Sequence, residues 1–272
     1  MTSETLPAQA TGTHSVSALR IERGQAQALT ETVAEETAIA LVFNGISHAV
    51  MMASPLDLED FALGFALSEA IIAKPSELID LDVVPGCDGI AVEITLVESR
   101  FQALKAVRRS MAGRTGCGLC GYESLDAAIR PLNAVTSDQQ LDAAEISAAM
   151  AVLHQAQPLN AATGATHVAM WWRPGQVIAR EDVGRHNALD KLIGATAREA
   201  DRSGIIVMSS RASYEIVHKA AAAGFSVVAA VSAPTALAIR MAEQAGITLI
   251  GFARGERMTV YSHPQRIRET AG

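Results

Sequence analysis

Two cysteines three residues apart are the most specific chemical feature of the sequence. Cys117 and Cys120 stand in the segment Gly116–Gly121, which contains three glycines. Two thiols at this spacing meet in a turn, and the glycines let the backbone bend and move. Four basic residues precede the pair: Lys105, Arg108, Arg109 and Arg114. Because nearby cations raise the thiolate fraction of a cysteine, the pattern favours a nucleophilic thiolate that takes up a sulfur atom as a persulfide, with the second thiol assisting its release.

Three other uses of the pair stay open. A structural zinc site normally needs four ligands, so Cys87 and a histidine would have to complete it. A thioredoxin-like redox site needs the pair where a strand meets a helix, whereas the flanking glycines are typical of a loop. The pair could also be chemically inert. For Cys87, which follows Pro85-Gly86, we expect a packed or bystander thiol.

Composition sets the class of protein. The 272 residues are 49% hydrophobic and 19% charged, which is typical of a globular chain with a substantial core. The net charge of −7 argues against a nucleic-acid partner, since many phosphates would have to be neutralised. Three cysteines are too few for a secreted disulfide scaffold, and the first twenty residues lack the pattern of a signal peptide. We therefore expect a cytoplasmic protein. The charge-free run 220–239 is interpreted as a buried helix end, strand and loop rather than a membrane span.

The first part of the chain predicts a small α+β domain over residues 19–112, after a disordered tail over residues 1–18. Asn44-Gly45 lies between two apolar runs, which indicates a two-residue β-hairpin. Ser54-Pro55 is expected to open a helix that runs to about Ile72, with Ser54 as its N-cap. Apolar residues alternate with others over Ile90–Leu96, which indicates a strand with one buried face.

From about residue 145 the pattern changes to alternating helices and strands. Residues 145–272 therefore predict a three-layer α/β/α domain with a largely parallel sheet, and residues 113–144 predict the connection that holds the cysteine loop. The expected strands are 167–172, 177–180, 205–208, 226–231 and 247–251, and the expected helices are 148–157, 187–198, 214–223 and 235–245.

Polar loops follow four of these strands, at residues 181–187, 209–211, 232–235 and 252–257. Ligands of open parallel sheets bind outside the carboxyl ends of the strands, and free N–H groups at helix starts favour anions. Four arginines can supply guanidinium groups at this edge: Arg185, Arg211, Arg254 and Arg257. The sequence thus predicts a site for a phosphorylated ligand.

Simpler roles exist for several of these residues. Ser232 and Thr235 could only cap their helix, and Asp182 with Gly184 could only build a turn. His186 lies one helical turn from Asp190, so a surface pair between them would explain it. The carboxylates Glu181 and Asp182 could bind a metal or a ribose, which is the weaker alternative, and we expect no bound metal.

These motifs resemble the FdhD family of formate dehydrogenase accessory proteins. The most specific match is the eleven-residue block Glu181–Lys191, and the cysteine pair, Ser232–Thr235 and Gly251–Tyr261 also fit, as do two weaker segments, Asn44-Gly45 and Ser54–Glu69. Two departures lie outside the cysteine segment: Ala70 and Ser210 stand where the family pattern has glycine.

The resemblance implies a C-terminal domain with the cytidine-deaminase-like fold, a cytoplasmic homodimer and a persulfide relay. It implies that a cysteine desulfurase loads sulfur onto Cys117, with Cys120 as its partner, for delivery to bis-molybdopterin guanine dinucleotide, the molybdenum cofactor of formate dehydrogenase. GDP could mimic the nucleotide part. The resemblance assigns contact with the guanine dinucleotide to residues 252–257. With the bottom-up candidates, the cofactor-binding set is Arg185, His186, Arg211, Ser232, Thr235, Phe252, Ala253, Arg254, Gly255, Glu256 and Arg257.

Two functions from other classes compete with the sulfur carrier. A non-catalytic chaperone would shelter the cofactor with the basic loops alone, without using the thiols. A zinc-dependent deaminase needs a ligand-x-Glu motif followed by Pro-Cys-x-x-Cys. The sequence has no His-x-Glu or Cys-x-Glu, and its single cysteine pair precedes the α/β domain, so deamination is only a remote alternative.

Overall fold

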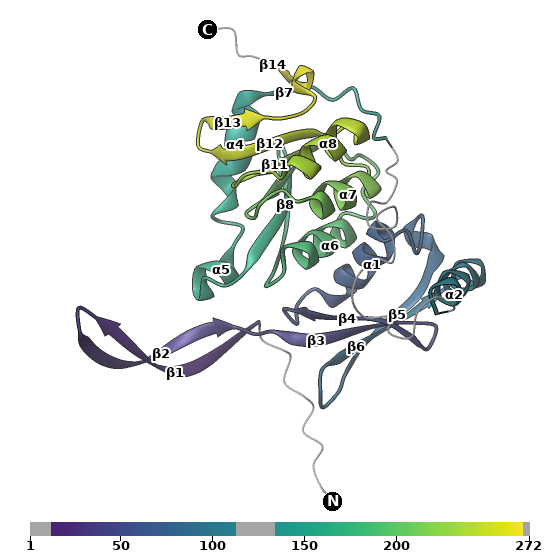
Figure 1. Ribbon diagram of the computed structural model, residues 1–272, viewed down its shortest axis with the longest axis horizontal. Helices are drawn as coiled ribbons and strands as arrows, with labels where there is room; N and C mark the ends of the chain where they lie inside the picture. Colours follow the sequence, from purple (N-terminus) through teal and green to yellow (C-terminus); the bar gives the residue numbers. More distant parts are fainter. Residues whose placement is uncertain (1–11, 113–133, 269–272) are drawn as a thin grey trace, which may run out of the picture.

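The computed structural model describes residues 12–112 and 134–268, which form a mixed α/β fold (Figure 1). An N-terminal part carries a projecting β-ribbon and a four-stranded sheet, and a C-terminal part is built on a six-stranded sheet. The predicted division into domains, with a connection over residues 113–144, remains a prediction.

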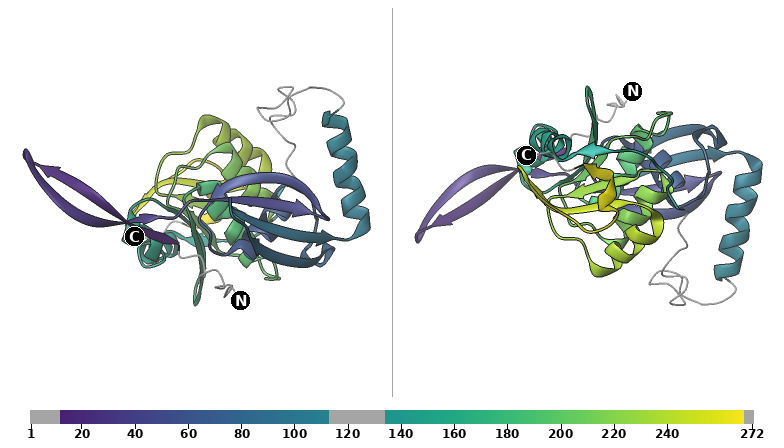
Figure 2. Two further views of the ribbon diagram at one scale, coloured as in Figure 1. Left: turned by 90° about the horizontal axis from the view of Figure 1, so that it is seen from below. Right: turned by 90° about the horizontal axis from the view of Figure 1, so that it is seen from above.

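The ribbon, which we call the arm, consists of β1 (Thr13–Glu22) and β2 (Gln25–Ala34). The two strands pair antiparallel along their whole length and extend away from the rest of the molecule (Figures 1 and 2). The predicted tail over residues 1–18 was therefore too long, because β1 already begins at Thr13. Strand β1 is held by its cross-strand hydrogen bonds to β2. Its sequence lacks the alternation of apolar and polar residues that would have predicted a half-buried strand.

The four-stranded sheet has the order β4-β3-β6-β5. Its strands are β3 (Thr37–Phe43), β4 (Ile46–Ala53), β5 (Leu78–Pro85) and β6 (Ile90–Leu96). The predicted hairpin and the predicted strand at 90–96 are confirmed, with φ 46° at Asn44 and 78° at Gly45. One face of this sheet packs on α1 (Leu58–Ser68), and α2 (Glu98–Ala112) follows β6; a 3₁₀ turn, η1, covers Pro75–Glu77.

The start of α1 corrects a prediction. Ser54 is not its N-cap, because the chain takes a left-handed turn at Asp57 (φ 53°) and the helix begins only at Leu58. Ser54 is instead fully buried. The helix ends at Ser68, and Ala70 then adopts φ 56°. That backbone region favours glycine, which gives a physical reason for the glycine that the family pattern has at this position.

The six-stranded sheet has the order β13-β12-β11-β10-β8-β9. Its strands are β8 (His167–Arg173), β9 (Gln176–Asp182), β10 (Ile205–Met208), β11 (Val227–Ala230), β12 (Thr248–Arg254) and β13 (Arg257–Val260). Only β10, β11 and β12 pair in parallel, so the sheet is mixed and not largely parallel. The reason is two tight hairpins: Pro174-Gly175 joins β8 to β9, and Gly255-Glu256 joins β12 to β13.

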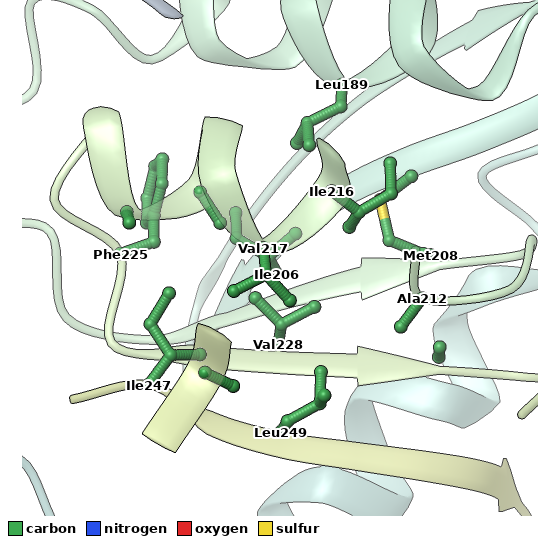
Figure 3. Close-up of a cluster of buried hydrophobic side chains, with 14 of the residues drawn as sticks. Leu189, Ile206, Met208, Ala212, Ile216, Val217, Phe225, Val228, Ile247 and Leu249 are labelled. Carbon is green, nitrogen blue, oxygen red and sulfur yellow. The ribbon is translucent and has the colours of Figure 1, made fainter. Parts of the chain in front are cut away.

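Helices cover both faces of this sheet. One face packs against α6 (Arg185–Ala195), α7 (Tyr214–Ala222) and α8 (Ala236–Ala245) around a buried apolar cluster (Figure 3). The other face packs against α4 (Ala143–Leu153). The strands alternate accordingly, with Ile206 and Met208 in the first cluster and Ile205 and Val207 in the second. The remaining elements are α5 (Pro158–Thr163), η2 (Pro264–Arg266) and the short pair β7 (Leu141–Asp142) and β14 (Ile267–Arg268).

The charge-free run 220–239 forms the end of α7, strand β11 and the start of α8, as predicted. Among the described residues, no helix has both the length and the apolar character needed to cross a membrane.

The two parts meet where α1 crosses α6. Two glycines allow the crossing: a Cβ on Gly64 would lie 1.7 Å from the carbonyl oxygen of Asp190, and one on Gly194 would lie 1.9 Å from that of Asp60. Arg180 of β9 adds an ion pair with Asp60 at 2.6 Å. Helix α1 therefore packs between the four-stranded sheet and the C-terminal helices (Figure 1).

We predict that Gly194→Ala destabilises the protein by about 1–3 kcal/mol, because the new methyl group meets backbone that has to move. The midpoint of urea unfolding measures the effect. Gly86→Ala is the comparison with a milder contact, since its Cβ would lie 3.3 Å from the carbonyl oxygen of Gly89, and it should lower the midpoint by less. Equal midpoints for the two variants would contradict this account of the crossing.

Candidate functional site

Four strand ends converge on one edge of the six-stranded sheet. Strand β8 runs antiparallel to both β10 and β9, so β9 is parallel to β10 although the two do not touch. The carboxyl ends of β9, β10, β11 and β12 therefore share one edge, as the four predicted loops require. We call it the loop edge.

At the loop edge, Asp182 and Glu181 both bond to other groups of the protein. Asp182 forms an ion pair of 2.7 Å with Lys191, and both side chains are 0% exposed. Glu181 accepts hydrogen bonds from the backbone N–H groups of Leu159 and Asn160, each at 2.8 Å, at the start of α5. These bonds commit both carboxylates to the protein's own structure, and the weaker alternative of a metal or ribose on them stays a prediction.

The same ion pair joins the two parts of the chain through Ser54. The Ser54 N–H donates to Asp182 at 3.0 Å, and the Ser54 carbonyl accepts from Lys191 Nζ at 2.8 Å. The Ser54 hydroxyl accepts from the N–H of Val183 at 3.2 Å, and Asn187 Nδ2 donates to the Met52 carbonyl at 2.8 Å. Much of the block 181–191 thus serves to dock the N-terminal part.

A second buried ionic cluster is centred on Asp190, the residue of α6 directly before Lys191. Asp190 contacts Lys219 of α7 at 2.9 Å and accepts from the Ser68 hydroxyl at 2.6 Å. Lys219 also contacts Glu69 at 3.0 Å. Burial alone would lower the pKa of Lys219, but Asp190 and Glu69 outweigh it and hold this pKa above its usual range. Asp190 is therefore unavailable to His186, and a surface pair between those two residues is wrong.

His186 instead contacts residues at the start of α7. Its Nε2 lies 2.7 Å from a carboxylate oxygen of Glu215 and 3.4 Å from the Ser213 hydroxyl. Burial lowers the pKa of His186, with Glu215 acting in the opposite direction. Its neighbour Arg185 has a buried Nε without a hydrogen-bond partner among the described residues.

The loops after β10 and β11 contribute less than expected. Arg211 is exposed. Thr235 caps α8, since its Oγ1 accepts from the N–H of Ala238 at 3.2 Å, so capping accounts for it. The Ser232 carbonyl accepts from the N–H of Phe252 at 3.2 Å, which ties this loop to the end of β12.

Residues 252–257 form a hairpin rather than an open loop. Strand β12 continues to Arg254, and Arg254 pairs with Arg257 of β13 across the turn Gly255-Glu256. Phe252 adopts φ 51° and its side chain is 42% exposed. Ala253 is buried while its neighbours on both sides are exposed, as the alternation of side chains along a strand requires.

A cavity of about 650 Å³ opens beside this hairpin, on the α4 side of the sheet. Of the predicted cofactor-binding residues only Ala253, Arg254 and Gly255 line it. Arg185, His186, Arg211, Ser232, Thr235, Phe252, Glu256 and Arg257 do not. The loop edge therefore carries two separate groups of candidates, one at the cavity and one toward the starts of α6, α7 and α8.

The cavity wall contains polar residues that the sequence did not predict. They are His154 just after α4, Gln157 just before α5, Asn160 of α5, Thr166 and His167, while Ser209 of the predicted loop 209–211 also lines the wall. His167 opens β8, and because β8 is antiparallel its first residue reaches the edge where its neighbours end. The loops at the carboxyl ends of the strands do not include this residue. The Pro174-Gly175 turn was the available signal, since a hairpin there fixes the direction of β8.

The cysteine pair lies outside the described residues, so the placement of Cys117 and Cys120 relative to the cavity stays a prediction. Cys87 is exposed, so the packed role expected for it is wrong and the bystander role stays a prediction. Within residues 12–112 and 134–268, no three His, Cys, Asp or Glu side chains cluster to hold a metal ion.

The sequence matches the FdhD/NarQ family over residues 34–268. The chain belongs to this family. Two FdhD proteins, each named "Sulfur carrier protein FdhD", are 53% identical to it: one from Cupriavidus necator over 95% of this chain and 92% of its own, and one from Bordetella bronchiseptica over 89% and 90%. A crystal structure described as that of a formate dehydrogenase accessory protein from Desulfotalea psychrophila has a TM-score of 0.74 and 25% identity, covering 95% of this chain and all of that one.

His167 gives this FdhD/NarQ chain a testable pH dependence. Burial lowers the pKa of His167 below its usual 6.5, and the charge of Arg185 lowers it further. As the pH falls through about 6.5, His167 therefore takes up a proton more readily in the unfolded chain than in the folded protein. The free energy of unfolding decreases as a result. Between about pH 7.5 and about pH 5.5, the urea midpoint should fall less in His167→Gln than in wild type. His14→Gln, on the exposed part of the arm, should behave as wild type; identical pH profiles for all three proteins would contradict the assignment.

Proposed function

We propose that this chain is a cytoplasmic sulfur carrier that takes persulfide sulfur from a cysteine desulfurase and transfers it to bis-molybdopterin guanine dinucleotide for formate dehydrogenase. The observation that carries the proposal is the 53% identity, over nearly the whole chain, to proteins named as sulfur carriers. The cysteine pair and the loop edge supply the two functions that such a carrier needs, a sulfur acceptor and a binding site for the cofactor.

The sulfur chemistry uses both thiols. The Cys117 thiolate attacks the outer sulfur of the desulfurase persulfide, so that the S–S bond of the donor breaks and its cysteine leaves as thiolate. Attack of the Cys120 thiolate on Cys117 Sγ then expels the carried atom as hydrosulfide and leaves a Cys117–Cys120 disulfide, which a cellular dithiol reduces. In this sense the protein is a sulfurtransferase.

The cavity supports the cofactor end of the proposal. Its volume of about 650 Å³ lies within the range of small-molecule sites, which are on the order of 300–1,000 Å³. Arg254 contributes a guanidinium group, and His154, Asn160 and Ser209 contribute polar atoms for a base or ribose. We assign the guanine nucleotide end of the cofactor to this cavity, and the pyrophosphates to the edge that Arg185 and His186 share. The C-terminal part is proposed to be a domain of the cytidine-deaminase-like fold, and the protein a homodimer.

We predict that wild type, after incubation with a cysteine desulfurase and cysteine, gains one sulfur atom that dithiothreitol removes, whereas Cys117→Ala gains none. Intact-protein mass spectrometry measures the gain. Cys87→Ala is the matched control, since it removes an exposed cysteine outside the pair and should load as wild type does. Formate dehydrogenase maturation should fail with Cys117→Ala and proceed normally with Cys87→Ala. Normal maturation with Cys117→Ala would favour the chaperone that only shelters the cofactor.

Arg254→Ala should weaken GDP binding by about tenfold or more, because a charge-assisted hydrogen bond contributes about 1.5–3 kcal/mol. Arg257→Ala should weaken binding too, but by less, since Arg257 lies across the hairpin from the cavity. Titration calorimetry measures both affinities. Arg240→Ala, which removes an exposed arginine of α8, is the control, and equal affinities in all four proteins would exclude nucleotide binding at the hairpin.

A further inference from the structure

Exposed apolar side chains concentrate on two surfaces of the N-terminal part. The described residues include nine large hydrophobic side chains that are exposed, and seven belong to the arm or the four-stranded sheet. They are Leu19, Ile21 and Val33 on the arm and Val50, Met52, Ile79 and Val84 on the sheet. Two such patches close together along the chain are typical of a protein–protein interface.

The arm has one face without charge. Strand alternation and the pairing register place Leu19 and Ile21 of β1 opposite Ala28 and Ala26 of β2, and the rest of this face carries the small side chains of Ser15, Ser17, Thr30 and Thr32. The opposite face carries Val33 and the charged pair Arg20–Glu31, whose side chains are 2.6 Å apart. A lone two-stranded ribbon is marginally stable in water at best, so the uncharged face is the one to be covered.

The four-stranded sheet is covered on one side only. Its inner face packs on α1 through Ile39, Leu41 and Phe43. The opposite face, which we call the outer face, holds an apolar row of four paired residues: Val50, Ala40, Ala91 and Val84. On the same face, Asp82 of β5 lies two residues before Val84 and pairs directly with Glu93 of β6.

This acidic end of the outer face lacks counter-charges. Neither Asp82 nor Glu93 has an ion pair within the described part of the chain, and like charges facing each other across strands are unfavourable. Arg23 at the tip of the arm is exposed and likewise has no ion-pair partner among the residues described. Arg23 can therefore supply a positive charge to the acidic end of the outer face, although Glu22 beside it is also exposed, and the apolar surfaces make up the rest of the match.

We infer that these two surfaces form the interface of a two-fold symmetric dimer, in which the arm of each copy lies on the outer face of its partner. The arm cannot fold back onto its own outer face, because β2 leads within two residues into β3 of that sheet and the arm points away from it (Figures 1 and 2). A second copy supplies both complementary surfaces, each used twice, as two-fold symmetry requires. The inference gives the proposed homodimer its contact surface and is independent of the sulfur chemistry.

The dimensions suit a stable dimer. Ten residues at about 3.3 Å per residue make an arm about 33 Å long, and two strands about 4.8 Å apart give it a width of about 10 Å. Each arm face then covers about 330 Å², and counting two arms and the two surfaces beneath them gives about 1,300 Å² of buried surface. Stable interfaces bury about 1,200–2,000 Å².

Light scattering coupled to size-exclusion chromatography tests the interface on the full chain. Wild type should elute with twice the chain mass of 28.6 kDa. The double variant Leu19→Glu/Ile21→Glu and the single variant Val50→Glu should each raise the dissociation constant about a hundredfold or more and elute as single chains at micromolar concentration. Val177→Glu, which charges an exposed apolar strand residue outside both surfaces, should remain dimeric. Circular dichroism should show all variants folded.

Charge reversal tests the identity of the occupant. Arg23→Glu should weaken the dimer, and Asp82→Arg combined with Arg23→Glu should restore it, since the contact joins the two positions only between copies. A monomeric wild type, dimeric Leu19→Glu/Ile21→Glu, or absence of rescue would overturn the inference. Sulfur loading of Cys117, measured on the same variants, reports separately on the carrier function, so that failure of one proposal is distinguishable from failure of the other.

Discussion

The fully buried ion pair between Asp182 and Lys191 is the interaction on which the arrangement of this protein depends. Its charges would be costly to bury alone, and they are accommodated because the backbone of Ser54 donates to one and accepts from the other. Each half of the chain therefore satisfies polar groups of the other half. Removing Ser54 from its place would leave both charges short of hydrogen bonds, so the position of the four-stranded sheet is fixed by electrostatics as well as by the glycine crossing of α1 and α6.

This constraint changes how the most specific sequence block is understood. Residues 181–191 look like a ligand-binding loop, because acidic, basic and glycine residues follow a strand and open a helix. In the fold, three of the block's five charged residues, Asp182, Asp190 and Lys191, are buried and paired. Arg185 and His186 remain partly exposed, while the cavity lies on the opposite side of the sheet and draws on α4 and α5.

The sequence predicted local structure well where period and turn chemistry are strong. The Asn44-Gly45 hairpin and strand β10 were found because positive-φ turn residues and short apolar runs specify them locally. The direction of β8 and the hairpin at 255–256 were missed, because apolar runs carry no sign of strand direction. The buried role of Ser54 was hidden for a different reason: a serine before a proline is an ordinary helix cap, and only a partner 128 residues away makes it an interface residue. His154 and His167 were missed because the wall they form exists only once α4 has packed across the sheet.

Helix α1 belongs to both halves of the molecule at once. Its phenylalanines lie in the core of the four-stranded sheet, while its glycine and acidic side face α6 and β9. Neither half has a complete core without it, so cooperativity spans the whole chain and a gene fragment encoding either half would yield a polypeptide with an uncovered side.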